Sequence, residues 1–251
     1  MSLPEALTAS EAQDRVSHGS DIVIVPYSSY MEPDGNVRLS IFSEMTTAAA
    51  ATLYETAGTE HTRIVAVGEQ TYGPGYPSTT ELMYAYLQRH GIAARAFPRQ
   101  HPEDANATPQ QIEWLKQEFG ADWQSRAPVL VGHEHHWARI RRLCRLFRLP
   151  ADFVDAAAIL EKAGKLTPAY AEAAAAYQSE GQDYERDVTR LTRFISPLGA
   201  GPATAMFRTL VRARTPTVVD VVRDGSDGKL RLYATTVREH LRSLAHEGRA
   251  A

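Results

Sequence analysis

The stretch GHEHHWAR, residues 132–139, places three histidines and a glutamate in four consecutive positions after an apolar run. Histidines can transfer protons near neutral pH, and they can also bind zinc. A zinc site needs three or four converging ligands, whereas adjacent residues on a tight turn rarely converge, and the HExxH motif is absent. We therefore predict no metal site. A simple helix-start role for His133 and Glu134 stays open beside proton transfer or anion binding.

Arg139 follows His136 by three residues, so both side chains should lie on one side of the helix that begins here. A cation in the first turn of a helix opposes the helix dipole, which favours a role for Arg139 in facing a ligand.

The rest of this helix should divide into a buried and an exposed face. The buried face comprises Trp137, Ile140, Leu143, Cys144 and Phe147. The exposed face, which should be solvated, comprises Arg141, Arg145 and Arg148. Cys144 is expected to be a packing residue and not a nucleophile.

Three continuous apolar runs predict strands that are buried on both faces of a parallel sheet. They lie in residues 21–29, 62–78 and 127–136, and helical patterns follow in residues 37–58, 79–91 and 137–149. A weaker run at 92–99 precedes a helical pattern at 106–119, and a fifth run at 150–156 should return to the sheet edge.

Capping signals support these helices. Ser78–Glu81 and Thr108–Gln111 fit capping boxes, and Gly58 and Gly91 fall where the preceding helices should end. Repeated strand, loop and helix predict an α/β fold, namely a three-layer Rossmann-like arrangement with a mostly parallel sheet.

Three segments are expected along the chain. They are an N-terminal helical segment at 1–19, the Rossmann-like domain at 20–163, and a C-terminal extension at 164–251 packed on that core. The extension reads as helix, hairpin (217–235) and helix, with DGSDG as the hairpin turn. A lid, an edge extension and a homo-oligomer contact all stay open as its role.

Composition excludes several classes of protein. A net charge of -3 argues against a nucleic-acid binder. A single cysteine rules out an internal disulfide and suits a reducing compartment. The polar N-terminus lacks a signal-peptide core, and no run approaches the ~18 apolar residues of a membrane span. The expectation is a cytoplasmic protein without membrane contact.

Ligands of open α/β sheets bind at the carboxyl ends of the strands. That rule selects four polar loops, at residues 26–36, 68–81, 98–109 and 132–139. No GxGxxG, GxxxxGK[ST] or GxSxG motif occurs in the chain. Within and beside these loops, the candidate ligand-binding residues are Tyr27, Ser28, Ser29, Arg38, Glu69, Gln70, Thr71, His133 and His135.

Residues 20–155 resemble the DUF218 (YdcF/SanA/ElyC-like) family in the order and spacing of their motifs. His136-Trp-Ala-Arg139 stands where the family has His-x-x-Arg after its last strand. Glu81 matches a helix-opening glutamate, while Asn106 and Gly68 match a family asparagine and glycine and join the ligand-binding candidates. The resemblance implies a Rossmann-type domain of bacterial origin. It also implies S-adenosylmethionine as a candidate cofactor, because one member is associated with that molecule.

We expect an enzyme, either a hydrolase or a transferase, that acts on a small anionic metabolite of nucleotide-like, phosphorylated or carboxylated type. Arg139 would hold the anion, His136 would act as general acid or base, and Glu81 would orient His136. One alternative is an S-adenosylmethionine-binding transferase or sensor. Another is a non-catalytic binding or regulatory module.

Overall fold

The apolar runs of the sequence become a four-stranded parallel sheet with the order β4-β1-β5-β6. The computed structural model describes residues 6–25, 29–32, 35–68, 75–92 and 108–175. The strands are β1 (Ile22–Ile24), β4 (Ile64–Ala66), β5 (Val129–Gly132) and β6 (Asp152–Asp155). β1 lies in the middle, because Val23 pairs with Val65 on one side and with Leu130 on the other.

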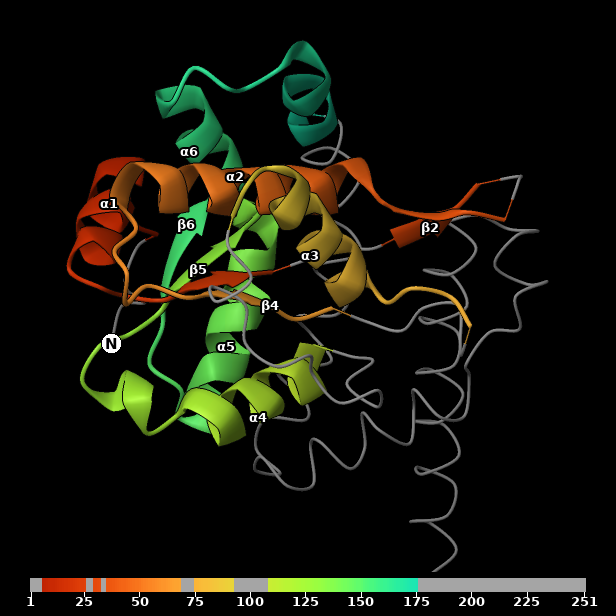
Figure 1. The fold of residues 1–251 in the computed structure, drawn as a ribbon. Helices are drawn as coiled ribbons and strands as arrows, with labels where there is room; N and C mark the ends of the chain where they lie inside the picture. The colour runs from red at the N-terminus through yellow and green to blue at the C-terminus, as the bar shows by residue number, and fades with distance from the viewer. Residues whose placement is uncertain (1–5, 26–28, 33–34, 69–74, 93–107, 176–251) are drawn as a thin grey trace, which may run out of the picture.

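Helices cover both faces of this sheet (Figure 1). One face carries α1 (Ala9–Ser17), α2 (Ile41–Ala57), α3 (Thr79–Arg89) and α6 (Ala156–Lys162). The other carries α4 (Thr108–Phe119), the 3-10 helix η2 (Asp122–Gln124) and α5 (Trp137–Phe147). These layers confirm the predicted Rossmann-like α/β fold with a parallel sheet.

Alternate residues of each strand enter the two halves of the core, as the two-residue period of a strand requires. In β1, Ile22 and Ile24 pack toward α2, whereas Val23 packs toward α4 and α5. The same division holds in β5, where Val131 and Leu130 point to opposite faces. Continuous apolar runs were therefore the correct signal for strands that are buried on both sides.

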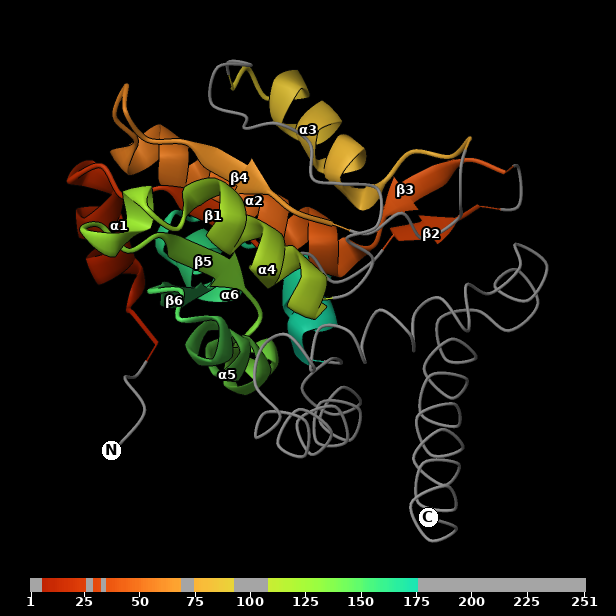
Figure 2. The ribbon, with the colours of Figure 1, turned by 90° about the horizontal axis from the view of Figure 1, so that it is seen from below.

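The chain leaves β1 in one direction and later returns past it in the other. The connection from β1 to β4 uses α2 on one face, whereas the connection from β4 to β5 carries first α3 on the face of α2 and then α4 on the opposite face (Figure 2). Helices of successive connections thus cover both faces of the sheet, as in doubly wound folds.

One predicted boundary was wrong. Residues 37–58 were expected to be helical throughout, but Val37–Leu39 forms strand β3, which pairs antiparallel with β2 (Ser29–Met31). Gly35 makes the turn between them with a φ of 84°. α2 begins only after Ser40, whose hydroxyl accepts a hydrogen bond from the Ser43 N–H at 3.3 Å. This cap fixes the start of α2, so the preceding residues can form the hairpin.

The N-terminal helical segment appears as α1. Its start is stabilised by a capping box between Thr8 and Glu11. Just before it, Leu7 forms a parallel bridge to Val154 of β6 and so extends the sheet edge. α6 ends near Gly164, and residues 168–175 are helical. The predicted weak strand from residue 93 on, the hairpin at 217–235 and the last helix lie outside the described residues.

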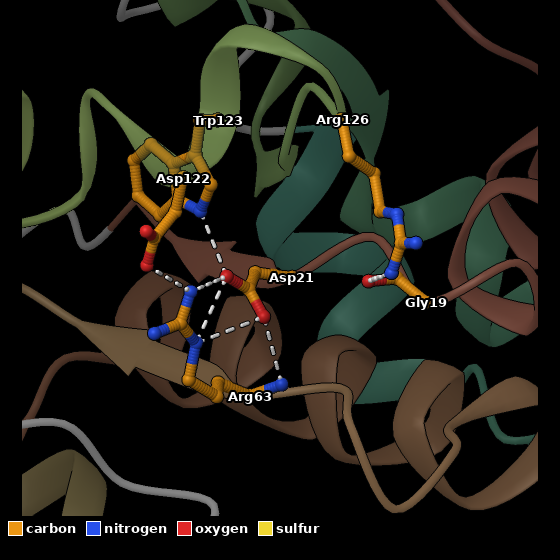
Figure 3. A network of polar contacts seen from close by, with 6 residues as sticks. All are labelled: Gly19, Asp21, Arg63, Asp122, Trp123 and Arg126. Carbon is orange, nitrogen blue, oxygen red and sulfur yellow. Dashed lines mark hydrogen bonds and ion pairs between the residues drawn. The ribbon is translucent and has the colours of Figure 1, made fainter.

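A polar network joins three segments at the amino edge of the sheet (Figure 3). The Asp21 carboxylate accepts hydrogen bonds from the backbone N–H and the guanidinium of Arg63 and, at 2.7 Å, from Nε1 of Trp123. Asp122 lies 3.3 Å from the same guanidinium. Hydrogen bonding to Asp21 is the main cause that raises the pKa of Arg63. The network ties the entries to β1 and β4 to the segment before β5.

Candidate functional site

The strand order places a topological switch point at the carboxyl ends of β1 and β5. From β1 the chain crosses to β4 on one side, while β5 lies on the other side of β1. Loops that leave such a pair of strands diverge to opposite faces, and the crevice between them is where ligands of doubly wound sheets bind. In this chain the segment after β5 is the histidine cluster.

Buried polar side chains concentrate at this edge. Among the described residues thirteen polar side chains are buried, and eight of them lie at the starts of α2 and α3 or just after β5. The eight are Ser43, Thr46, Thr47, Ser78, Thr79, Thr80, His133 and His136. Burying a polar group costs free energy unless it is hydrogen-bonded, and several of the eight bond locally, as the Thr46 and Thr47 hydroxyls do to the carbonyl oxygen of Ser43.

His133 links the end of β5 to the first turn of α2. Its Nε2 lies 3.0 Å from the carbonyl oxygen of Phe42, and its ring stands edge-on to the Phe42 ring. Because a carbonyl oxygen only accepts, Nε2 of His133 carries the hydrogen. The His133 ring also lies 6.1 Å, centroid to centroid, from that of His136.

Residues Glu134–His136 form the 3-10 helix η3, which leads directly into α5. The side chain of His133 does not cap it. Instead the carboxylate of Asp155, at the end of β6, accepts hydrogen bonds from the N–H of Glu134 at 3.0 Å and from that of Ala158 at 3.2 Å. The Asp155 side chain therefore caps the start of both η3 and α6. The suggested capping role of the His133 side chain was wrong.

The two central candidates differ in exposure. His136 is 1% exposed, whereas Arg139, in the first turn of α5, is only half-buried. Four residues of the predicted buried face of α5 are buried, while Trp137 is partly buried against the same core. Arg145 and Arg148 are exposed.

Arg141 contradicts the prediction for the exposed face of α5. It is 9% exposed, and its guanidinium lies 4.4 Å from the ring centroid of Trp137. Trp137 in turn stacks on Phe153 at 4.3 Å. Burial is the first cause that lowers the pKa of Arg141, with the nearby charge of Arg145 second. A residue four positions before it on the helix thus offers an aromatic surface that spacing alone did not reveal.

Gly68 and Glu81 have structural partners at the start of α3. The Gly68 N–H donates to Oγ1 of Thr80 at 2.8 Å, and a Cβ on Gly68 would lie 2.6 Å from Cβ of Thr79. The Glu81 carboxylate accepts from the backbone N–H and the hydroxyl of Ser78, which confirms the predicted capping box. Glu81 is exposed, and its orienting role toward His136 stays a prediction.

β4 and β5 flank β1, so the ends of these two strands lie about two strand spacings, ~10 Å, apart. Glu81 begins a helix on the face of α2, and Arg139 begins one on the opposite face. Only a ligand that spans the switch point could therefore contact both residues.

The hairpin candidates lie beyond the carboxyl edge (Figure 1). Arg38 pairs with Glu32 at 2.7 Å and is 62% exposed, and Ser29 pairs with Leu39 through the backbone of β2 and β3. Tyr27, Ser28, Glu69, Gln70, Thr71 and Asn106 lie outside the described residues. The side chains of His135 and Thr108 are not described either, so the Thr108 capping box stays a prediction.

Metal binding and cysteine reactivity have little support in the described part of the chain. No group of three histidine, cysteine or acidic side chains is placed there to hold a metal ion. Cys144 is buried, and burial raises its pKa to about 12, which confirms a packing residue in place of a nucleophile. None of the helices in the described ranges is long and apolar enough to cross a membrane.

Asp155 was not among the predicted site residues, although a strand was expected to cover it. An aspartate that ends a strand just before an alanine-rich helix was the available signal for a helix cap.

Comparison of the chain with family models, with curated proteins and with solved structures finds no match. The resemblance to the DUF218 family therefore stays a prediction from the motifs, and function has to be argued from the carboxyl edge itself.

Proposed function

We propose that the chain is an enzyme that acts on a small anionic metabolite at the carboxyl ends of β1 and β5. The observation that carries the proposal is the concentration of eight buried polar side chains at this edge. The starts of α2, α3 and α5 meet there as well, and helix N-termini favour anions through their dipoles and unpaired N–H groups.

Arg139 makes the first contact with the anion in this proposal. Its position in the first turn of α5 puts a positive charge beside the switch point, and a planar guanidinium binds phosphate or carboxylate through two parallel hydrogen bonds. Its partial exposure allows a ligand to approach without rearrangement of the core.

His136 supplies the acid–base step. Because it is 1% exposed, a ligand reaches it only when the residues that cover it move. Closure of such a site excludes water and strengthens the electrostatic contacts inside it. We assign Glu81 no part in this step, because its carboxylate caps the start of α3. The reaction class we propose is the expected hydrolase or transferase, with His136 as its general acid or base.

Calorimetric titration with three probes tests the proposal: inorganic phosphate, adenosine monophosphate and citrate. At least one should bind, and Arg139→Ala should weaken its affinity by about tenfold or more, as the loss of a charge-assisted bidentate contact implies. Arg145→Ala is the matched control, because Arg145 lies on the same helix and is exposed in its last turn. Equal losses in the two variants, or no binding of any probe to the native chain, would refute the proposal.

A further inference from the structure

The chain returns to the carboxyl edge after α6. α6 begins at that edge, behind β6, and the chain reverses at Gly164, which has a φ of 66°. Lys165 Nζ then lies 2.8 Å from Glu55, near the end of α2, and Tyr170 reaches Glu44 at its start. Residues 165–175, here named the return segment, thus run along α2 toward the candidate site (Figure 1).

Tyr170, in the middle of the return segment, binds the start of α2. Its hydroxyl donates a hydrogen bond of 2.8 Å to Oε1 of Glu44, while Leu166, Tyr170 and Ala174 pack against the core beside α2 and α3. The Tyr170 hydroxyl has one hydrogen, so its oxygen accepts the bond that joins it to Tyr86. Burial is the largest cause that raises the pKa of Tyr170, and the hydrogen bond to Glu44 is the second. The phenol therefore stays a donor at neutral pH.

The first turn of α2 is thereby held from two directions. Phe42 accepts the hydrogen of His133, which follows β5, and Glu44 accepts the hydrogen of Tyr170 two residues later. Between them lies Ser43, which is fully buried. A carboxylate at this position is also favourable toward the helix dipole. A shift of this turn would move the wall of the switch point that faces the histidines.

We propose that Tyr170 is a positioning residue, through which the return segment fixes the first turn of α2 as a wall of the anion site. The inference rests on the proposed function for its effect on binding, but not for its effect on α2 itself. It gives the beginning of the C-terminal extension a role in the site that is neither a lid nor an oligomer contact.

Tyr170→Phe in the full chain is the test, since it removes the hydroxyl and keeps the ring in the core. Hydrogen exchange of a peptide that covers residues 41–47 should become about tenfold faster, because a bond to a charged group is lost from a local opening unit. Inorganic phosphate should bind severalfold more weakly. Lys165→Ala is the matched control. It breaks an exposed ion pair that joins the return segment to the other end of α2, and such pairs contribute little.

Glu44→Ala, which removes the acceptor, should reproduce both effects, and the double variant should be no worse than Glu44→Ala alone, since both single variants lose the same hydrogen bond. If exchange of residues 41–47 is unchanged in Tyr170→Phe, the inference is wrong whether or not phosphate binds. If exchange rises but phosphate affinity equals that of the native chain, Tyr170 is structural only and the positioning role is refuted. If the native chain binds no phosphate, adenosine monophosphate or citrate, the proposed function fails, while the exchange result still decides the contact.

Discussion

Asp21→Asn is expected to lower the stability of the fold without changing the candidate site. Asp21 sits at the amino edge of the sheet, where it joins Arg63 and Trp123 (Figure 3). The histidines follow β5 at the opposite edge. Asparagine keeps the shape of the side chain but removes its charge. It also replaces one oxygen by an amide that faces the N–H donors of Arg63 or Trp123.

The size of the effect follows from burial. Removal of one member of a buried ion pair costs about 3–5 kcal/mol when the other charge stays buried. The Asp21 side chain is 6% exposed, but that of Arg63 is 35% exposed and keeps Asp122 as a partner. Water can therefore hydrate Arg63, and we expect a loss of about 2 kcal/mol, or roughly 4–8 °C in Tm. Asp122→Asn, at a side chain that is 59% exposed, should cost less than about 0.5 kcal/mol.

Urea denaturation followed by circular dichroism measures both variants, and phosphate titration below the unfolding midpoint measures the site. Asp21→Asn should shift the midpoint and leave the affinity for phosphate unchanged. Equal stability of Asp21→Asn and the native chain, or equal losses in the two variants, would contradict the assignment of Asp21 as the buried centre of the network. A loss of affinity in folded Asp21→Asn would contradict the separation of the two edges.

Three smaller predictions concern packing and backbone. Gly68→Ala should destabilise the chain by about 1–3 kcal/mol in the same urea assay, because its Cβ would overlap that of Thr79. Arg148→Gly should raise the free energy of unfolding by about 0.5–1 kcal/mol, since Arg148 ends α5 with a φ of 54°. Iodoacetamide at pH 8 should leave Cys144 unmodified in the native chain and alkylate it in urea, as mass spectrometry would show, because burial raises its pKa to about 12. A loss of stability in Arg148→Gly, or rapid alkylation of the native thiol, would contradict the backbone or burial argument.

The layers of the fold were predictable because the strands are buried on both faces. Continuous apolar runs such as Ile22–Ile24 and Val129–Gly132 carry that signal without help from distant residues. The capping box at Ser78 is equally local. The β2–β3 hairpin was missed because its second strand, Val37–Leu39, is short and runs directly into an apolar helical pattern.

The position of the candidate residues at the strand ends was predictable, but their contacts were not. The rule for strand ends found His133 and His136 without a view of the fold. The partners of His133, Asp155 and Tyr170 come from segments 21 to 126 residues away, and no spacing pattern encodes such pairs. Arg141 was misplaced for a related reason, since its burial depends on the stack of Trp137 on Phe153.

The central claim is that the carboxyl edge at β1 and β5 binds a small anion. The most direct test is a map of backbone amide shifts in the uniformly labelled chain, recorded by NMR as inorganic phosphate and then adenosine monophosphate are added. We predict that the largest shifts fall on the first turns of α2 and α3 and on residues 133–139. Shifts centred on Asp21 and Arg63 at the amino edge, or no shifts with either anion, would contradict it.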